Sequence, residues 1–112
     1  MATTHTKIFH RIAILGMGRS GQAVLDACIE DGISVNVFDD NGATPRTKAY
    51  FRDFNDWDMD GLEAMVISPG IPHSHPAPHP AAKRCIEAGV PIISEVEFAL
   101  RRGRTGRWVS IT

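Results

Sequence analysis

The chain has 112 residues, enough for one small domain, and its 43% hydrophobic and 22% charged content is usual for globular proteins. The formal net charge of −1 gives no global field that would attract nucleic acid or an anionic membrane surface. No apolar run approaches the roughly 20 residues of a membrane span. Because the N-terminal segment 1–10 is polar and lacks a signal-peptide core, we expect a cytoplasmic protein. Cys28 and Cys85 are predicted to be free, buried thiols, as in a reducing compartment.

Strand and helix patterns alternate along the chain at the lengths of βαβ units. Short apolar runs predict strands at 11–15, 34–38, 64–67, 91–93 and 108–111. Helical spacing predicts helices at 19–31, 81–88 and 95–102. Residues 43–61 indicate only a short helix or a packed loop. The sequence therefore predicts an α/β fold, a Rossmann-like parallel sheet with helices on both faces.

A glycine-rich turn, G-x-G-x-x-G, joins the first strand to the first helix at Gly16, Gly18 and Gly21. The first glycine permits a tight turn, the second lets a phosphate approach the backbone, and the third lets the helix pack against the strand. The helix that begins at Arg19 points free N–H groups at an anion, and Ser20 can add a hydroxyl donor. The pattern favours a nucleotide or another diphosphate over a turn that serves packing alone.

Asp39 follows the second strand, about 20 residues after the glycines, where a dinucleotide site would have an acid. Its carboxylate could accept from the ribose of NAD or from an N–H group of a base. Asp39 could equally be a turn aspartate, because Asp-Asp-Asn-Gly is good turn chemistry. An NAD(H)-binding module of a regulator or dehydrogenase therefore stays open at this point.

The segment from Ser68 to Pro72 follows the third strand, at the sheet edge where ligands bind in open α/β folds. Ser68 offers a hydroxyl and Gly70 allows close approach of a ligand to the backbone. A proline-stiffened loop without a ligand fits the same residues. Composition does not decide between the two interpretations.

Three further patterns are given no function. His73, His75 and His79 have no carboxylate or cysteine among them, so we expect no metal site. The arginines between 101 and 107 are interpreted as a solvated cluster at a helix C-terminus, without nucleic-acid binding. Glu95 and Glu97 open a helix, where acids are favoured by the helix dipole, and no catalytic residue is assigned.

Five stretches, read in order, resemble the N-terminal part of a known family. These are ILGMGRSG, VFDD, SPGIP, HPAAKRCIEAGVPIISEVEF and VSIT, spread over 11–112. Together they are similar to the D-glutamate-adding branch of the Mur ligase family, which acts on UDP-N-acetylmuramoyl-L-alanine. The sequence motif SPGIP argues against the sibling branch that adds L-alanine. Against this family, residues 73–78 contain a four-residue insertion.

The resemblance implies a UDP site rather than an NAD site. The diphosphate-binding positions would be Gly18, Arg19, Ser20 and Gly21. The uracil-binding positions would be Asp39, Asp40, Asn41, Ser68, Pro69 and Gly70. Some relatives carry Thr and Arg where this chain has Asp40 and Asn41, so the individual contacts of these two residues depart from the family.

The resemblance also divides the chain into a polar tail (1–10), a UDP-binding domain (11–94) and the start of a central ATPase domain (95–112). In the family, ATP phosphorylates the substrate carboxylate and the amine of D-glutamate attacks the acyl phosphate, so ATP and Mg²⁺ are expected for the full-length enzyme. The chain has no G-K-[ST] sequence, and by itself it is expected to bind the UDP-sugar without catalysis. The tail 95–112 is expected to pack non-natively, to associate with another chain through its last strand, or to be poorly ordered.

Overall fold

The structure, a computed structural model, describes residues 8–71 and 77–103. Its elements in chain order are β1 (Arg11–Leu15), α1 (Arg19–Asp31), β2 (Ser34–Phe38), the 3₁₀ turns η1 (Phe54–Asp56) and η2 (Met59–Gly61), β3 (Ala64–Ile67), α2 (Pro80–Ala88), β4 (Ile92–Ser94) and α3 (Glu95–Gly103). The expected elements within these ranges are confirmed, with β4 one residue later and α2 and α3 one residue longer. The expected strand 108–111 and insertion at 73–78 fall wholly or largely outside the described residues.

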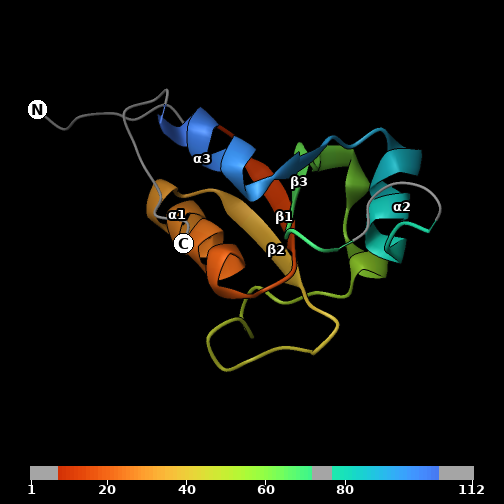
Figure 1. The fold of residues 1–112 in the computed structure, drawn as a ribbon, viewed down its shortest axis with the longest axis horizontal. Helices are drawn as coiled ribbons and strands as arrows, with labels where there is room; N and C mark the ends of the chain where they lie inside the picture. Colours follow the sequence, from red (N-terminus) through yellow and green to blue (C-terminus); the bar gives the residue numbers. More distant parts are fainter. Residues whose placement is uncertain (1–7, 72–76, 104–112) are drawn as a thin grey trace, which may run out of the picture.

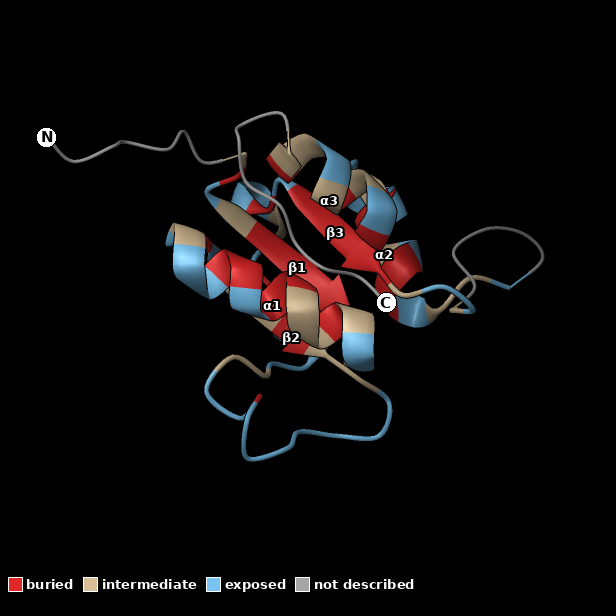
Figure 2. Cartoon of the chain, turned by 60° about the vertical axis from the view of Figure 1, so that its left-hand side comes forward, coloured by how far each residue is buried: buried red, intermediate tan, exposed pale blue. Residues whose placement is uncertain are grey.

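The strands form one parallel sheet in the order β2-β1-β3-β4. β1 and β3 occupy its centre, and every residue of β3 is buried, as expected for strands covered on both faces (Figure 2). Because all four strands run the same way, their carboxyl ends meet at a single edge. The glycine loop, Asp39, Ser68 and the start of α3 follow these ends and are therefore gathered at that edge.

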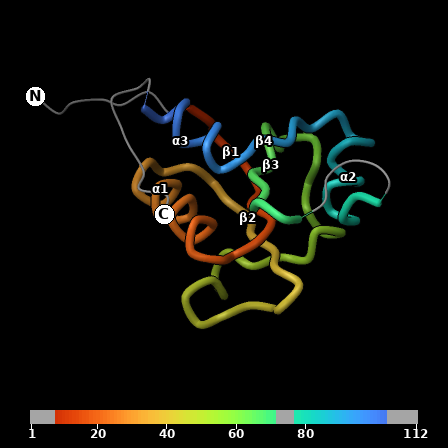
Figure 3. Tube along the Cα trace, in the orientation of Figure 1, coloured from red at the N-terminus to blue at the C-terminus, as the bar shows by residue number. Residues whose placement is uncertain are grey.

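Helices cover both faces of the sheet, with α1 and α3 on one side and α2 on the other (Figures 1 and 3). Alternate residues of β1 point to opposite faces. Ile12 and Ile14 join the hydrophobic cluster of α1 and α3, whereas Ala13 and Leu15 join that of α2. The predicted α/β architecture is thus confirmed.

α3 packs firmly on the same sheet as α1. Phe98 is fully buried and lies parallel to Phe9, with ring centroids 6.5 Å apart. Arg102 is only 3% exposed, and its guanidinium donates to Asp31 at 2.9 Å and to Glu30 at 3.2 Å. The expectation of a solvated arginine cluster is therefore wrong for Arg102, which is buried and paired with two acids at the C-terminal end of α1. The division of the chain after residue 94 stays a prediction.

The segment between β2 and β3 folds without an α-helix. Trp57 is buried and its indole N–H donates to the carbonyl of Arg52 at 3.1 Å. Val37 of the edge strand β2 bridges to Phe51, which partly covers that edge. Across residues 8–71 and 77–103, no helix is long and apolar enough to cross a lipid bilayer.

Candidate functional site

The glycine loop has three glycines for three different reasons. Gly16 has φ +99°, and a Cβ there would lie 2.5 Å from Ser68 Oγ. A Cβ on Gly21 would lie 2.1 Å from the carbonyl oxygen of Gly16. Gly18 has an ordinary φ of −72°, and a Cβ there would meet nothing within 4 Å. Packing thus requires Gly16 and Gly21, whereas Gly18 leaves open space in front of the helix.

The N-terminus of α1 has no cap from a side chain. Gly18 is the N-cap residue, and the first helical bond runs from Gln22 N–H to its carbonyl at 3.0 Å. Within the described part of the chain, the N–H groups of residues 18–21 have no bonded acceptor. Arg19 is exposed beside them. Free N–H groups, the positive end of the helix dipole and a nearby guanidinium together form a suitable site for an anion.

Asp39 holds the glycine loop against the end of β2. Its half-buried carboxylate accepts from Met17 N–H at 2.7 Å and from Asn41 N–H at 2.8 Å. A carboxylate has about four lone-pair positions, so acceptor capacity remains after these two bonds. Asp39 is thus both a turn residue and a half-exposed acceptor beside the loop.

Asp40 is engaged with the start of α2. His79 Nδ1 accepts from Ala81 N–H at 3.0 Å, so Nε2 carries the hydrogen and donates to the Asp40 carboxylate at 3.0 Å. Asp40 itself is exposed, and so is the neighbouring Asn41. Of the predicted uracil-binding acids, Asp39 therefore faces the glycine loop and Asp40 is paired with the neighbouring helix.

Residues Ser68 to Ile71 form a tight turn after β3. Ile71 N–H donates to the Ser68 carbonyl at 3.3 Å, and Gly70 has φ +89°, as a type II turn requires. The Ser68 hydroxyl lies 3.4 Å from the Gly16 carbonyl, and Pro69 and Gly70 are exposed. A small cavity of about 150 Å³ lies between this turn and the start of α3.

The structure places the predicted site residues in three neighbouring groups. Residues 18–21 follow β1, residues 39–41 follow β2 and residues 68–70 follow β3. Since β1 lies between β2 and β3, the two halves of the predicted uracil set flank the glycine loop. Two strand spacings separate these halves by about 10 Å.

Glu95 is a further residue at this edge, and the sequence pattern does not mark it as part of a site. Glu95 is 3% exposed, and its carboxylate accepts from Ser20 Oγ at 2.5 Å and from Ser68 Oγ at 3.1 Å. A general dipole role is therefore an incomplete account of it. The sequence signal is Ser94, whose hydroxyl accepts from Glu97 N–H at 2.9 Å and caps the start of α3 directly after β4, which places Glu95 at this edge.

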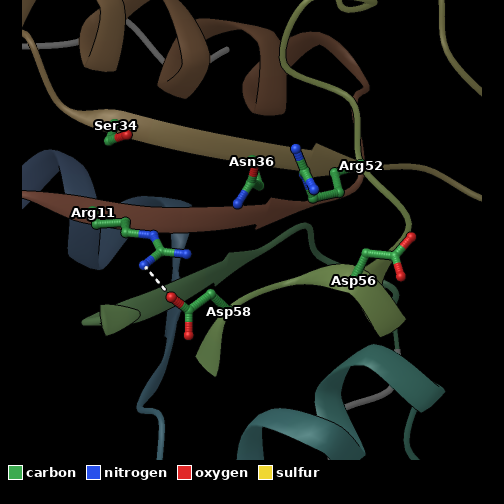
Figure 4. A pocket seen from close by; sticks show the side chains of 6 residues that line it. All are labelled: Arg11, Ser34, Asn36, Arg52, Asp56 and Asp58. Atoms are coloured by element: carbon green, nitrogen blue, oxygen red, sulfur yellow. Dashed lines mark hydrogen bonds and ion pairs between the residues drawn. The ribbon is translucent and has the colours of Figure 1, made fainter. Parts of the chain in front are cut away.

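A second cleft, of about 500 Å³, lies along β1 and β2, between these strands and the segment that joins β2 to β3 (Figure 4). It is lined by Arg11, Ser34, Asn36, Arg52, Asp56 and Asp58. Arg11 donates to Asp58 at 3.2 Å, and this bond holds the pKa of the Asp58 carboxyl below its ordinary value. The lining charges are mixed, and none of the predicted site residues belongs to this cleft.

The described ranges contain neither a cluster of metal ligands nor a reactive thiol. There, no group of three or more His, Cys, Asp and Glu side chains could hold a metal ion, while His73 and His75 fall outside the ranges. Burial raises the pKa of the Cys28 thiol to about 12 and that of Cys85 to about 11. Neither buried thiol is a reactive thiolate near neutral pH.

Comparison with known proteins matches residues 10–94 to the family described as Mur ligase MurD-like, N-terminal domain. A UDP-N-acetylmuramoylalanine--D-glutamate ligase of Paramagnetospirillum magneticum is 33% identical over 106 residues, covering 91% of this chain and 23% of that protein. Proteins of the same name from Cereibacter sphaeroides and Rhizobium meliloti are 36% and 35% identical, covering 88% and 84% of this chain.

The chain spans less than a quarter of the length of these relatives, 23% and 22% for the first two. The matches cover the glycine loop and the Ser68 turn together. They do not favour the alternative of an NAD(H)-binding module from a regulator or a dehydrogenase.

Proposed function

Since the chain belongs to the Mur ligase family as a MurD-like N-terminal domain, we propose that it binds the UDP part of UDP-N-acetylmuramoyl-L-alanine. The observation that carries this proposal is the open N-terminus of α1. Gly18 has no side-chain cap, a Cβ there would meet nothing within 4 Å, and its own N–H group and the next three have no bonded acceptor. A phosphate group of the UDP diphosphate is an anion that can enter such a space and accept from such donors.

The diphosphate would be held by the N–H groups of Gly18, Arg19, Ser20 and Gly21. The exposed Arg19 guanidinium adds a charged donor at the same helix end, and the Ser20 hydroxyl lies in the first turn. Anions at a helix N-terminus gain from both the free N–H groups and the dipole.

The uracil ring would be bound beside Asp39. The carboxylate is fixed by Met17 N–H and Asn41 N–H and keeps acceptor capacity for the N–H of a pyrimidine ring. Asn41 lies next to it, and Ser68, Pro69 and Gly70 border the other side of the glycine loop. Asp40 accepts only from His79 among the described residues and is exposed, so it would contribute through its remaining acceptor capacity.

The whole protein, by this proposal, joins D-glutamate to the bound substrate in peptidoglycan precursor synthesis. Its relatives are named as D-glutamate ligases, and three quarters or more of their length lies outside the matched segment. ATP, Mg²⁺ and D-glutamate would be bound by that remaining part, and the segment described here would supply substrate binding. The two free, buried cysteines fit a cytoplasmic setting.

Nuclear magnetic resonance titration of the 112-residue chain with UDP tests the site. We expect amide shifts at Gly18, Ser20 and Asp39 at millimolar UDP, and competition when UDP-N-acetylmuramoyl-L-alanine is added. NADH is the matched competitor, because it carries a diphosphate but no uracil. Absence of shifts at these residues with UDP, or stronger displacement by NADH, would overturn the assignment.

A further inference from the structure

Glu95 joins three elements at the carboxyl edge of the sheet. It is the first residue of α3 and is buried there at 3% exposure. One carboxylate oxygen accepts from Ser20 Oγ in the first turn of α1, and the other accepts from Ser68 Oγ in the turn after β3. Burial of a carboxylate is costly unless its oxygens are hydrogen-bonded. The hydrogen bonds from these two serines offset that cost for Glu95.

The carboxylate occupies the electrostatic position of an anion. α1 has no acid in its own first turn, and Glu95 brings one to that end of the helix from α3. A serine hydroxyl has a single hydrogen, so Ser20 cannot donate to Glu95 and to a phosphate oxygen at the same time. A diphosphate at Gly18–Gly21 would also lie close to the negative charge of Glu95, and like charges repel.

We propose that Glu95 is a positioning residue that holds Ser20 and the start of α3 while the site is empty, and releases Ser20 when a diphosphate binds. The inference rests on the proposed function and adds a consequence to it. Occupancy of the glycine loop is transmitted to α3 through a single carboxylate, and therefore to whatever follows α3 in the full-length ligase.

The far end of α3 is anchored independently of Glu95. Phe98 is fully buried, and Arg102 is paired with Asp31 and Glu30 at the C-terminal end of α1. These contacts do not involve the glycine loop. The response to a ligand should therefore be largest between Glu95 and Phe98 and should decrease toward Arg102.

The first test compares Glu95→Gln with Glu97→Gln by calorimetric titration with UDP and with uridine. Glu97 is two residues further on the same helix and pairs with Arg101 instead, so its variant is a matched control for loss of charge. We expect Glu95→Gln to tighten UDP binding by about threefold to tenfold, because a competing charge is removed. Uridine lacks the diphosphate, and its affinity should stay within about twofold.

A double-mutant cycle with Ser20→Ala isolates the competition. In the wild-type background the Ser20 hydroxyl must first leave Glu95, whereas in Glu95→Gln it leaves a weaker, neutral partner. Ser20→Ala should therefore cost more UDP affinity in the Glu95→Gln background than in the wild type. Equal losses in both backgrounds, or weaker UDP binding by Glu95→Gln alone, would show that Glu95 does not compete with the ligand.

Amide hydrogen exchange without ligand gives an independent test of the holding role. Residues 95–98 should exchange faster in Glu95→Gln than in Glu97→Gln, and in the wild type they should exchange faster with UDP than without it. If ligand-free exchange is the same in both variants, the holding role is wrong whatever binds. If UDP fails to bind the wild type, the proposed function and the release step are both wrong, while exchange still decides the holding role.

Discussion

Helices α1 and α2 begin near the same sheet edge and satisfy their N-termini in opposite ways. At α2, His79 caps Ala81 N–H, and Pro80 in the first turn has no N–H group to satisfy. The His79 side chain is 9% exposed and lies against Phe38 and Phe54. At α1 the N-cap is a glycine, with no side chain to accept a hydrogen bond.

The difference separates the capped ends of α2 and α3 from the open end of α1, where the proposed ligand would bind. α3 resembles α2 in this respect, because the Ser94 hydroxyl accepts from Glu97 N–H. The chain therefore supplies caps where a helix only has to begin, and leaves the donors of α1 open next to the glycine loop. A ligand is the simplest occupant for donors that the fold does not satisfy.

The largest expected effect on stability comes from substituting a glycine at the N-terminus of α1. Gly21→Ala should lower the free energy of unfolding by about 3 kcal/mol or more, because its methyl group would meet the Gly16 carbonyl. Gly18→Ala should lower that free energy by only about 0.5–1 kcal/mol, the cost of alanine instead of glycine at an N-cap, because its methyl group meets no protein atom. Urea unfolding measures both, and similar losses would contradict the separate roles of the two glycines.

For UDP binding, the Gly18 substitution should be the more harmful of the two. Gly18→Ala should weaken UDP binding by about tenfold, equivalent to ~1.4 kcal/mol, because its methyl group stands where the phosphate approaches. Uridine, titrated in parallel, should lose much less affinity. An unchanged UDP affinity in Gly18→Ala would mean that the open space at α1 is not the diphosphate site.

Removing the cap of α2 should have an effect of intermediate size. His79→Ala should cost about 1–2 kcal/mol of unfolding free energy, because it removes the cap of Ala81 N–H and the contacts with two aromatic rings. His10→Ala is the matched control, since His10 has a side chain 79% exposed and should cost less than about 0.5 kcal/mol. If both variants lost the same unfolding free energy, the structural role assigned to the α2 cap would be wrong.

The parts of the fold that local patterns specify were predictable. β1, α1, β2 and β3 have the predicted bounds, since apolar runs and a C-terminal Gly32 mark them in the sequence. The region 43–61 was not, because it is built from 3₁₀ turns capped by Asp53 and Asp58 and has no repeating apolar spacing. The start of α2 was placed one residue late because Pro80 opens the helix after the His79 cap.

The part of the candidate site that lies in the glycine turn was predictable from the sequence. The glycine spacing and the strand–helix context located Gly18 and its neighbours without the structure. Glu95 and Arg102 were misjudged because their partners are distant in sequence, 75 residues to Ser20 and 71 residues to Asp31. Only the fold brings such pairs together, and an acid or a base at a helix end looks the same in the sequence whether it is solvated or buried.

The smallest expected effect on stability comes from giving α1 the kind of cap that α2 already has. Gly18 has φ −72° and ψ −166°, an extended conformation that a serine N-cap adopts without strain. In Gly18→Ser the new hydroxyl would accept from an N–H group of the first turn. Thermal or urea unfolding should show a gain of a few tenths of a kcal/mol, roughly the difference between serine and glycine as N-cap residues.

That small gain should come with a loss of ligand affinity, since the same N–H group can no longer serve a phosphate oxygen. Gly18→Ala provides the comparison, because it fills the space without capping the helix. Both variants should bind UDP more weakly than the wild type, and only Gly18→Ser should be more stable. If Gly18→Ser were more stable and still bound UDP with wild-type affinity, the donors of α1 would be dispensable for the ligand, and the contrast between the open and the capped helix would carry no function.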